Sequence, residues 1–139
     1  MVQVYQQQVA EAGIKVNLVK APADGYWSEV WMKEPVVTTS WGQRPADQIL
    51  NEDYRGGAPW NETFWNRADF DKLLDQAREE LDFDKRKALY HQLQRILYEE
   101  GGSFIPFHVN QAVATTARVS GLQAVFADAI RYHLVHVSD

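Results

Sequence analysis

The chain has 139 residues, a formal net charge of -5 and a sequence pI of about 5.3, which fits a single domain. Nucleic-acid-binding proteins usually carry a basic surface, so this acidic composition argues against a nucleic-acid partner. The absence of cysteine excludes disulfides and thiolate metal sites, and no apolar run reaches the roughly 20 residues that span a membrane. Met1 leads directly into a helical pattern, so we expect no signal peptide in this sequence.

The first forty residues have the pattern of a strand–helix–strand unit. Apolar residues three and four apart predict a helix over 2–12, which Gly13 should end. Alternation over 14–18 predicts a strand, and Asp24 is a suitable cap for a short helix. The β-branched, uncharged run 36–41 predicts a second strand, buried on both faces. Two such strands should lie parallel, with a right-handed connection.

Three helices are predicted in the middle of the chain. Pro45 suits the first turn of the first helix, Asn66 and Asp84 are expected to cap the next two, and Gly101 with Gly102 should end the last in a left-handed conformation. Burial of each leucine or isoleucine contributes roughly 1.5–3 kcal/mol, against about 0.2–0.5 kcal/mol for a surface ion pair, so apolar packing should dominate. The apolar faces consist of Ile49, Leu50 and Tyr54; of Phe70, Leu73, Leu74, Ala77 and Leu81; and of Leu89, Leu93, Ile96 and Leu97.

Further strand character is present in the last third of the chain. The segments 104–109 and 113–117 are rich in apolar and β-branched residues, and so is 130–137 after Gly121. Together with the strand–helix–strand unit, they predict an α/β fold, with a small mixed sheet, a βαβ unit and flanking helices.

The loop after the second predicted strand is the first candidate binding site. In open α/β sheets, ligands bind beyond the carboxyl ends of strands, which indicates Trp41, Gly42, Gln43 and Arg44. The residue before a proline is biased toward an extended backbone, so Arg44 could present its guanidinium to a carboxylate or phosphate. The alternative is that Arg44 pairs with Asp47 or with a neighbouring helix.

The loop 59–61 is the second candidate. The indole of Trp60 provides stacking area, and the amide of Asn61 provides both a donor and an acceptor. The alternative is a loop that a buried tryptophan anchors.

We expect no catalysis, no cofactor and no metal. His133 and His136 are three apart, a spacing that sends them to opposite faces of a strand, and no phosphate-binding loop or nucleophile elbow is present. A small hydrolase or transferase that uses Asp47, His108 or the carboxylates around Asp69 is the least favoured alternative.

One ordered series of residues is more specific than any of these single features. It consists of Trp60, Asn61, Trp65, Asn66, Phe70, Asp71, Leu73, Leu74, Asp82, Lys85, Arg86, Leu89, Gly101, Ile105 and Pro106. In order and spacing the series resembles the peptide/nickel/opine class (family 5) of bacterial periplasmic solute-binding proteins, which serve ABC importers. The resemblance extends from residues 12–16 to residues 119–121.

The resemblance implies the second, carboxyl-side lobe of a two-lobed type II periplasmic-binding-protein-like fold. Residues 1–121 would form this lobe, and residues 122–139 would return toward the missing first lobe. The implied function is capture of a small solute in the periplasm and its delivery to an ABC permease in the membrane, without catalysis. Trp41 to Arg44, and Trp60 with Asn61, would face the cleft between the lobes.

One departure from the family bears on the solute. Peptide binders of this kind carry an aspartate soon after the tryptophan, which accepts the peptide's ammonium group, whereas here Gln43 and Arg44 occupy that loop. This favours a solute with an anionic group, such as an opine, a sugar acid or a phosphorylated compound. The isolated lobe should bind solute weakly or not at all, because half of the enclosing surface is absent.

A stand-alone interaction module is the main alternative to solute capture. Such a module would use its aromatic residues to grip another protein and would expose a broad apolar patch. Self-association of the isolated lobe is compatible with both hypotheses, because removal of a lobe exposes surface that the lobe would cover.

Overall fold

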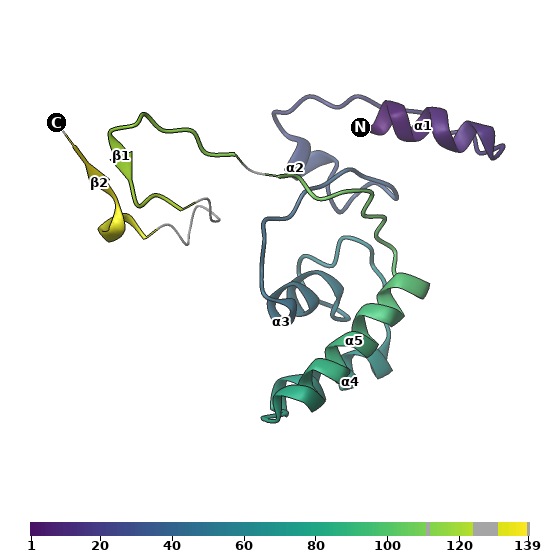
Figure 1. The fold of residues 1–139 in the computed structure, drawn as a ribbon. Coiled ribbons are helices and arrows are strands. Elements are labelled where there is room, and N and C mark those ends of the chain that lie inside the picture. Colours follow the sequence, from purple (N-terminus) through teal and green to yellow (C-terminus); the bar gives the residue numbers. More distant parts are fainter. Residues whose placement is uncertain (111, 124–130, 139) are drawn as a thin grey trace. The chain divides into compact units, whose positions relative to one another are not determined.

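The computed structural model describes residues 1–110, 112–123 and 131–138. It divides the chain into two compact units, Met1–Thr39 and Ser40–Asp139. Helices account for 43% of the described residues and strands for 3% (Figure 1). The predicted α/β fold, with its small mixed sheet and βαβ unit, is therefore wrong, because two short antiparallel strands are the only sheet among the described residues.

In the first unit the two predicted helices form and the predicted strands do not. Helix α1 (Val2–Glu11) ends before Gly13, whose φ of 78° only glycine adopts easily. Helix α2 (Tyr26–Glu29) starts after Gly25, so the cap expected from Asp24 is absent. Residues 14–18 are irregular, and the Gln6 side chain donates a hydrogen bond to the carbonyl of Val16 at 2.6 Å.

The segment 36–41 is also irregular, although it was predicted as a buried strand. Val36 is 89% exposed. The Tyr26 hydroxyl donates to the carbonyl of Thr38 at 2.8 Å and accepts from its N–H at 3.3 Å, so a side chain uses the backbone groups that a strand neighbour would need. Without an adjacent strand, a β-branched run has no ladder to join.

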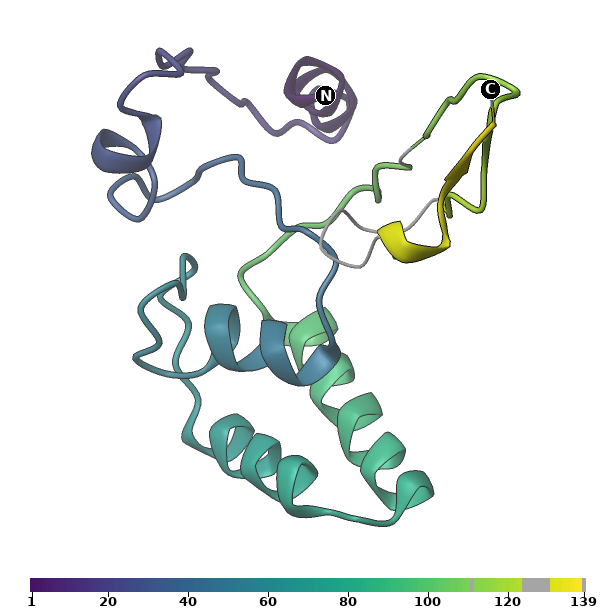
Figure 2. The same cartoon turned by 90° about the vertical axis from the view of Figure 1, so that its left-hand side faces the viewer.

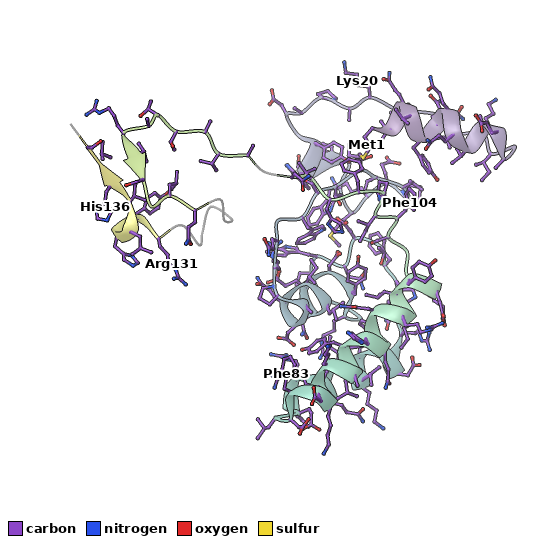
Figure 3. The ribbon with its side chains drawn as sticks, viewed as in Figure 1. Met1, Lys20, Phe83, Phe104, Arg131 and His136 are labelled. Atoms are coloured by element: carbon purple, nitrogen blue, oxygen red, sulfur yellow. The ribbon has the colours of Figure 1, made fainter. Side chains whose placement is uncertain are left out.

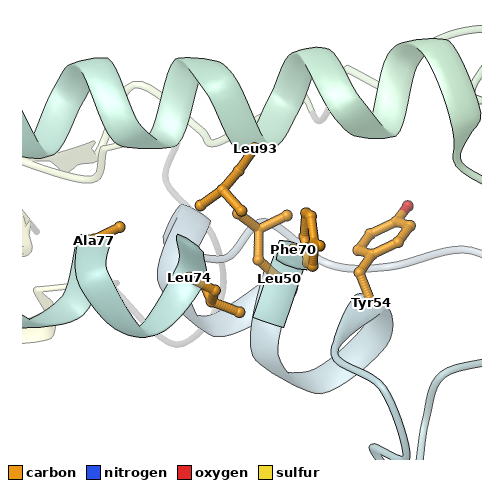
Figure 4. Packing of buried hydrophobic residues seen from close by; sticks show 6 residues of the cluster. All are labelled: Leu50, Tyr54, Phe70, Leu74, Ala77 and Leu93. Atoms are coloured by element: carbon orange, nitrogen blue, oxygen red, sulfur yellow. The ribbon is translucent and has the colours of Figure 1, made fainter. Parts of the chain in front are cut away.

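The second unit contains a hydrophobic core between helices. Helix α3 (Ala46–Ile49) continues into the π-helical turn η1 (Leu50–Tyr54), and α4 (Ala68–Glu79) and α5 (Phe83–Glu100) lie side by side as a hairpin (Figure 2). Figure 4 shows Leu93 of α5 pointing toward Leu50 of η1, with Phe70 of α4 beside them. The buried core consists of Leu50, Tyr54, Phe70, Leu74, Ala77 and Leu93.

The ends of the hairpin helices differ in detail from the prediction. Asp82, and not Asp84, caps α5 by accepting the N–H of Lys85 at 3.0 Å, and α4 has no side-chain cap from Asn66. Gly101 ends α5 with a φ of -69°, so the expected left-handed stop is wrong. A side chain there would instead place a Cβ 2.4 Å from the Leu97 carbonyl oxygen, which explains why the position suits glycine.

The carboxyl-terminal part contains the short sheet. Strands β1 (Val119–Ser120) and β2 (His136–Val137) pair antiparallel, and a 3-10 turn, η3 (Tyr132–Leu134), precedes β2. The predicted strands over 104–109 and 113–117 do not form, and of the strand predicted over 130–137 only β2 is observed. Residues 111, 124–130 and 139 lie outside the described residues, so the predicted boundary between residues 121 and 122 stays a prediction.

The side chains of Phe104, Arg131 and His136 can be followed in Figure 3. Phe104 begins the extended segment after α5 and is 70% exposed. Across the part of the chain that the structure describes, no helix has the length and apolar character needed to cross a membrane.

Candidate functional site

The two predicted binding loops meet in the second unit. The rings of Trp41 and Trp60 lie 5.9 Å apart between centroids, inclined at 47°. The guanidinium carbon of Arg44 lies 4.8 Å from the centroid of the Trp41 ring, within the range of a cation–π contact. Trp41, Arg44 and Trp60 therefore form one cluster, which we call the aromatic–arginine cluster.

Two glutamates hold this cluster in place. The indole N–H of Trp41 donates to Oε1 of Glu62 at 3.2 Å, and Nε of Arg44 pairs with Oε2 of Glu52 in η1 at 3.2 Å. The alternative in which Arg44 pairs with a neighbouring helix is thus present, although its partner is Glu52 and not Asp47. Because an arginine carries five N–H donors, the pair with Glu52 still leaves donors for a ligand.

Asn61 has a different position from its neighbour Trp60. Its side chain is 4% exposed, whereas Trp60 is 44% exposed. The Asn61 amide donates to the carbonyls of Arg55 at 3.1 Å and Trp65 at 2.7 Å, and its oxygen accepts from the Thr63 hydroxyl at 2.9 Å. Asn61 therefore holds the loop together, and its amide is engaged with partners inside the protein.

The tryptophan that anchors this loop is Trp65. It is half-buried and packs edge-on against Phe70, with 5.0 Å between centroids and an angle of 76°. Trp60 is thus left for surface contacts. Gly42 and Gln43 are exposed between the two anchored side chains of their loop.

Sequence reasoning missed Asp53, which lies behind the cluster. Asp53 is 2% exposed, and its Oδ1 has no hydrogen-bond partner among the described residues. Burial, and then the negative charge of Glu62, raise the pKa of Asp53 to about 7, although hydrogen bonds from the Tyr54 side chain and the Glu62 backbone, and the Arg44 charge, oppose this. The burial of Asp53 could have been predicted from its position three residues after Leu50, because this spacing places both residues on the same face of a helix.

Tyr54 extends the same buried network. Burial raises the pKa of Tyr54, while a hydrogen bond with the Ser103 side chain opposes the increase. Asp53, Tyr54 and Ser103 thus connect η1 to the segment that follows α5. The buried polar groups of Asp53 and Tyr54 therefore lie next to the aromatic–arginine cluster, whose two indole rings offer area for stacking.

The residues considered for hydrolysis are engaged elsewhere or exposed. Oδ1 of Asp47 accepts from the Tyr90 hydroxyl at 3.0 Å and pairs with Arg78 at 3.2 Å. The hydrogen bond from Arg67 lowers the pKa of Asp69, and His108 is exposed. Within the described ranges, no three His, Cys, Asp or Glu side chains gather closely enough to hold a metal ion.

Comparisons with protein-family models, with curated proteins and with solved structures found no match to this chain. Any function of this chain therefore has to be inferred from the geometry of the aromatic–arginine cluster and from the ordered residue series of the sequence.

Proposed function

We propose that this chain captures a small solute for a bacterial ABC importer, as the carboxyl-side part of a solute-binding protein of the peptide/nickel/opine class. The observation that carries the proposal is that Trp41, Arg44 and Trp60 meet, although they come from two separate loops. The ordered residue series from Trp60 to Pro106 supports the same family. Capture would occur in the periplasm, and the partners would be the membrane permease and the first lobe.

The cluster favours a solute that combines a flat or apolar part with an anionic group. Two neighbouring indole rings provide stacking area, and the guanidinium of Arg44 can bind a carboxylate or phosphate through parallel hydrogen bonds. Glu52 already pairs with Nε of Arg44, so the solute would approach the remaining N–H groups. Opines, sugar acids and phosphorylated compounds meet these requirements.

Titrations of the two-lobed protein that contains this chain, with such solutes and followed by tryptophan fluorescence, test the proposal, because the lobe alone lacks half of the enclosing surface. Arg44→Ala should weaken binding roughly tenfold or more, because a charged hydrogen bond contributes about 1.5–3 kcal/mol. Arg44→Lys should give an intermediate loss, since lysine keeps the charge but not the planar fork of donors. Arg95→Ala, at an exposed position whose guanidinium pairs with Glu99 on the same helix, is the matched control. If Arg44→Ala bound the solute within about twofold of the wild-type affinity, the guanidinium would not contribute to binding as proposed.

Protein binding is a second candidate, favoured by a specific observation. The segment 104–109 exposes four apolar side chains, those of Phe104, Ile105, Phe107 and Val109. Exposed apolar patches of this kind often mark contact surfaces. If this candidate is correct, light scattering should show self-association or pairing that Ile105→Asp abolishes, whereas Trp60→Ala should leave the association intact.

A further inference from the structure

An open groove of about 490 Å³ lies where α3, α4 and α5 meet. The groove shares no lining residue with the aromatic–arginine cluster. Its lining consists of Pro45, Ala46, Asp47, Arg78, Arg86 and Tyr90.

Asp47 organises one side of the groove. Its Oδ1 accepts hydrogen bonds from the Tyr90 hydroxyl at 3.0 Å and from the Asn51 amide at 3.1 Å, and it pairs with Nε of Arg78 at 3.2 Å. Three donors therefore converge on a single carboxylate oxygen. The charge of Asp47 is compensated within the protein, and Arg78 is held at the groove with N–H groups to spare.

Arg86 is held at the other side from α5. Its Nη1 donates to the carbonyl of Glu80 at 3.0 Å, and its guanidinium lies 5.8 Å from the centroid of the Phe83 ring. These contacts fix the side chain, so little rotamer freedom would be lost on binding a ligand. Two guanidiniums thus face the groove with one compensated carboxylate, in a protein whose net charge is -5.

We propose that this groove is a second binding site, which takes a small anion with a carboxylate or phosphate group held between Arg78 and Arg86. The planar guanidinium matches both groups through paired N–H donors, and two arginines from different helices can contact one anion from two directions. Tyr90 contributes the apolar wall of the site, because its hydroxyl is engaged with Asp47. The site goes beyond the proposed solute capture and does not depend on it.

The test is a titration of the full chain with inorganic phosphate and, separately, with succinate, at constant ionic strength. Two-dimensional NMR of the backbone amides and the arginine Nε–H groups provides the readout. We expect saturable shifts at Arg78 and Arg86 with at least one of the two anions. A response to phosphate alone assigns a phosphorylated ligand, and a response to succinate alone assigns a carboxylate ligand. The absence of saturation with both anions would overturn the proposal.

Substitutions distinguish specific anion binding in the groove from non-specific attraction of anions to surface arginines. Arg86→Gln should lower the affinity for the anion that gives saturable shifts at least tenfold. Arg95→Gln, an exposed position on the same helix, should bind that anion with wild-type affinity. Equal affinity in wild type and Arg86→Gln would contradict the proposal. Circular dichroism checks that α5 is intact, and Arg78→Gln replaces Arg86→Gln if it is not. Arg44→Ala should leave these shifts unchanged, so a failure of solute capture at the aromatic–arginine cluster is distinguishable from a failure here.

Discussion

The helical region 46–100 contains a cluster of buried apolar side chains, whereas the segment 104–109 exposes its large apolar side chains, although both belong to the same unit. Phe70 and Leu93 are fully buried, whereas Phe104 is mostly exposed. A helix satisfies its own backbone hydrogen bonds, so neighbouring helices can form a core from local contacts. An extended segment needs another strand for its backbone groups. The comparison shows that the core of this chain forms where the backbone supplies its own partners.

The largest expected effect comes from a pair of phenylalanine substitutions on the two sides of this comparison. Phe70→Ala should lower the free energy of unfolding by about 3–5 kcal/mol, because it leaves a cavity between α4, α5 and η1. Phe107→Ala, at an exposed position of the segment 104–109, should change it by less than about 0.5 kcal/mol. Urea denaturation followed by circular dichroism at helical wavelengths measures both values. Equal losses would mean that the segment 104–109 is packed in solution.

A pH-dependent effect should follow from the buried carboxyl of Asp53. The pKa of Asp53 is about 7 in the folded chain, whereas the ordinary pKa of an aspartate, expected in the unfolded chain, is 3.8. The folded state therefore binds more protons in this window, and stability should fall as pH rises from about 4 to about 7. A pKa difference of this size corresponds to at most roughly 4 kcal/mol.

Asp53→Asn removes the titrating group and should flatten this part of the stability profile. Urea denaturation at closely spaced pH values gives the difference between variant and wild type. That difference should grow in favour of Asp53→Asn up to about pH 7 and then stay constant. Asp84→Asn, at an exposed position, is the control and should follow the wild-type profile. Parallel profiles for Asp53→Asn and wild type would show that Asp53 does not titrate in this range.

A smaller effect should separate the two asparagines near the start of α4. Asn61→Ala removes three hydrogen bonds that close the loop below Trp60, and it should cost about 1–3 kcal/mol. Asn66→Ala, at an exposed position that does not cap α4, should cost less than about 0.5 kcal/mol. The same denaturation experiment compares them. If Asn66→Ala were the costlier change, the cap predicted from the sequence would be present in solution.

The helices could be predicted from the sequence because their signal is local. The spacing of Phe70, Leu74 and Ala77 is sufficient to place α4 and its buried face, and the same reasoning locates α1 and α5. Leu81, predicted on the same face, lies beyond the end of α4 and is 91% exposed, so that part of the prediction is wrong. Strand prediction failed for 14–18 and 36–41, because alternation and β-branching indicate only that a segment fits a sheet. Whether a partner strand exists is a long-range property that the local pattern does not contain.

The candidate site was predictable in part. The meeting of Trp41 with Trp60 agrees with the positions named from the sequence, but the reason given, the end of a buried strand, was wrong. Asn61 stabilises its loop through hydrogen bonds to the backbone carbonyls of Arg55 and Trp65. Such contacts depend on the folded geometry and cannot be predicted from the residue type. Asp53 was missed because burial of a carboxylate is costly and therefore unexpected from composition.

The most direct test of the central claim is NMR of the tryptophan indole N–H groups of this chain within the two-lobed protein, during titration with an opine, a sugar acid or a phosphorylated solute. The chain has five tryptophans, and Trp41→Phe and Trp60→Phe variants assign the two signals that matter. We predict saturable shifts for Trp41, whose N–H donates to Glu62, and for Trp60, while Trp65, which packs against Phe70, stays unchanged. Solute binding that leaves the Trp41 and Trp60 signals unmoved, or that shifts all five alike, would contradict solute capture at the aromatic–arginine cluster.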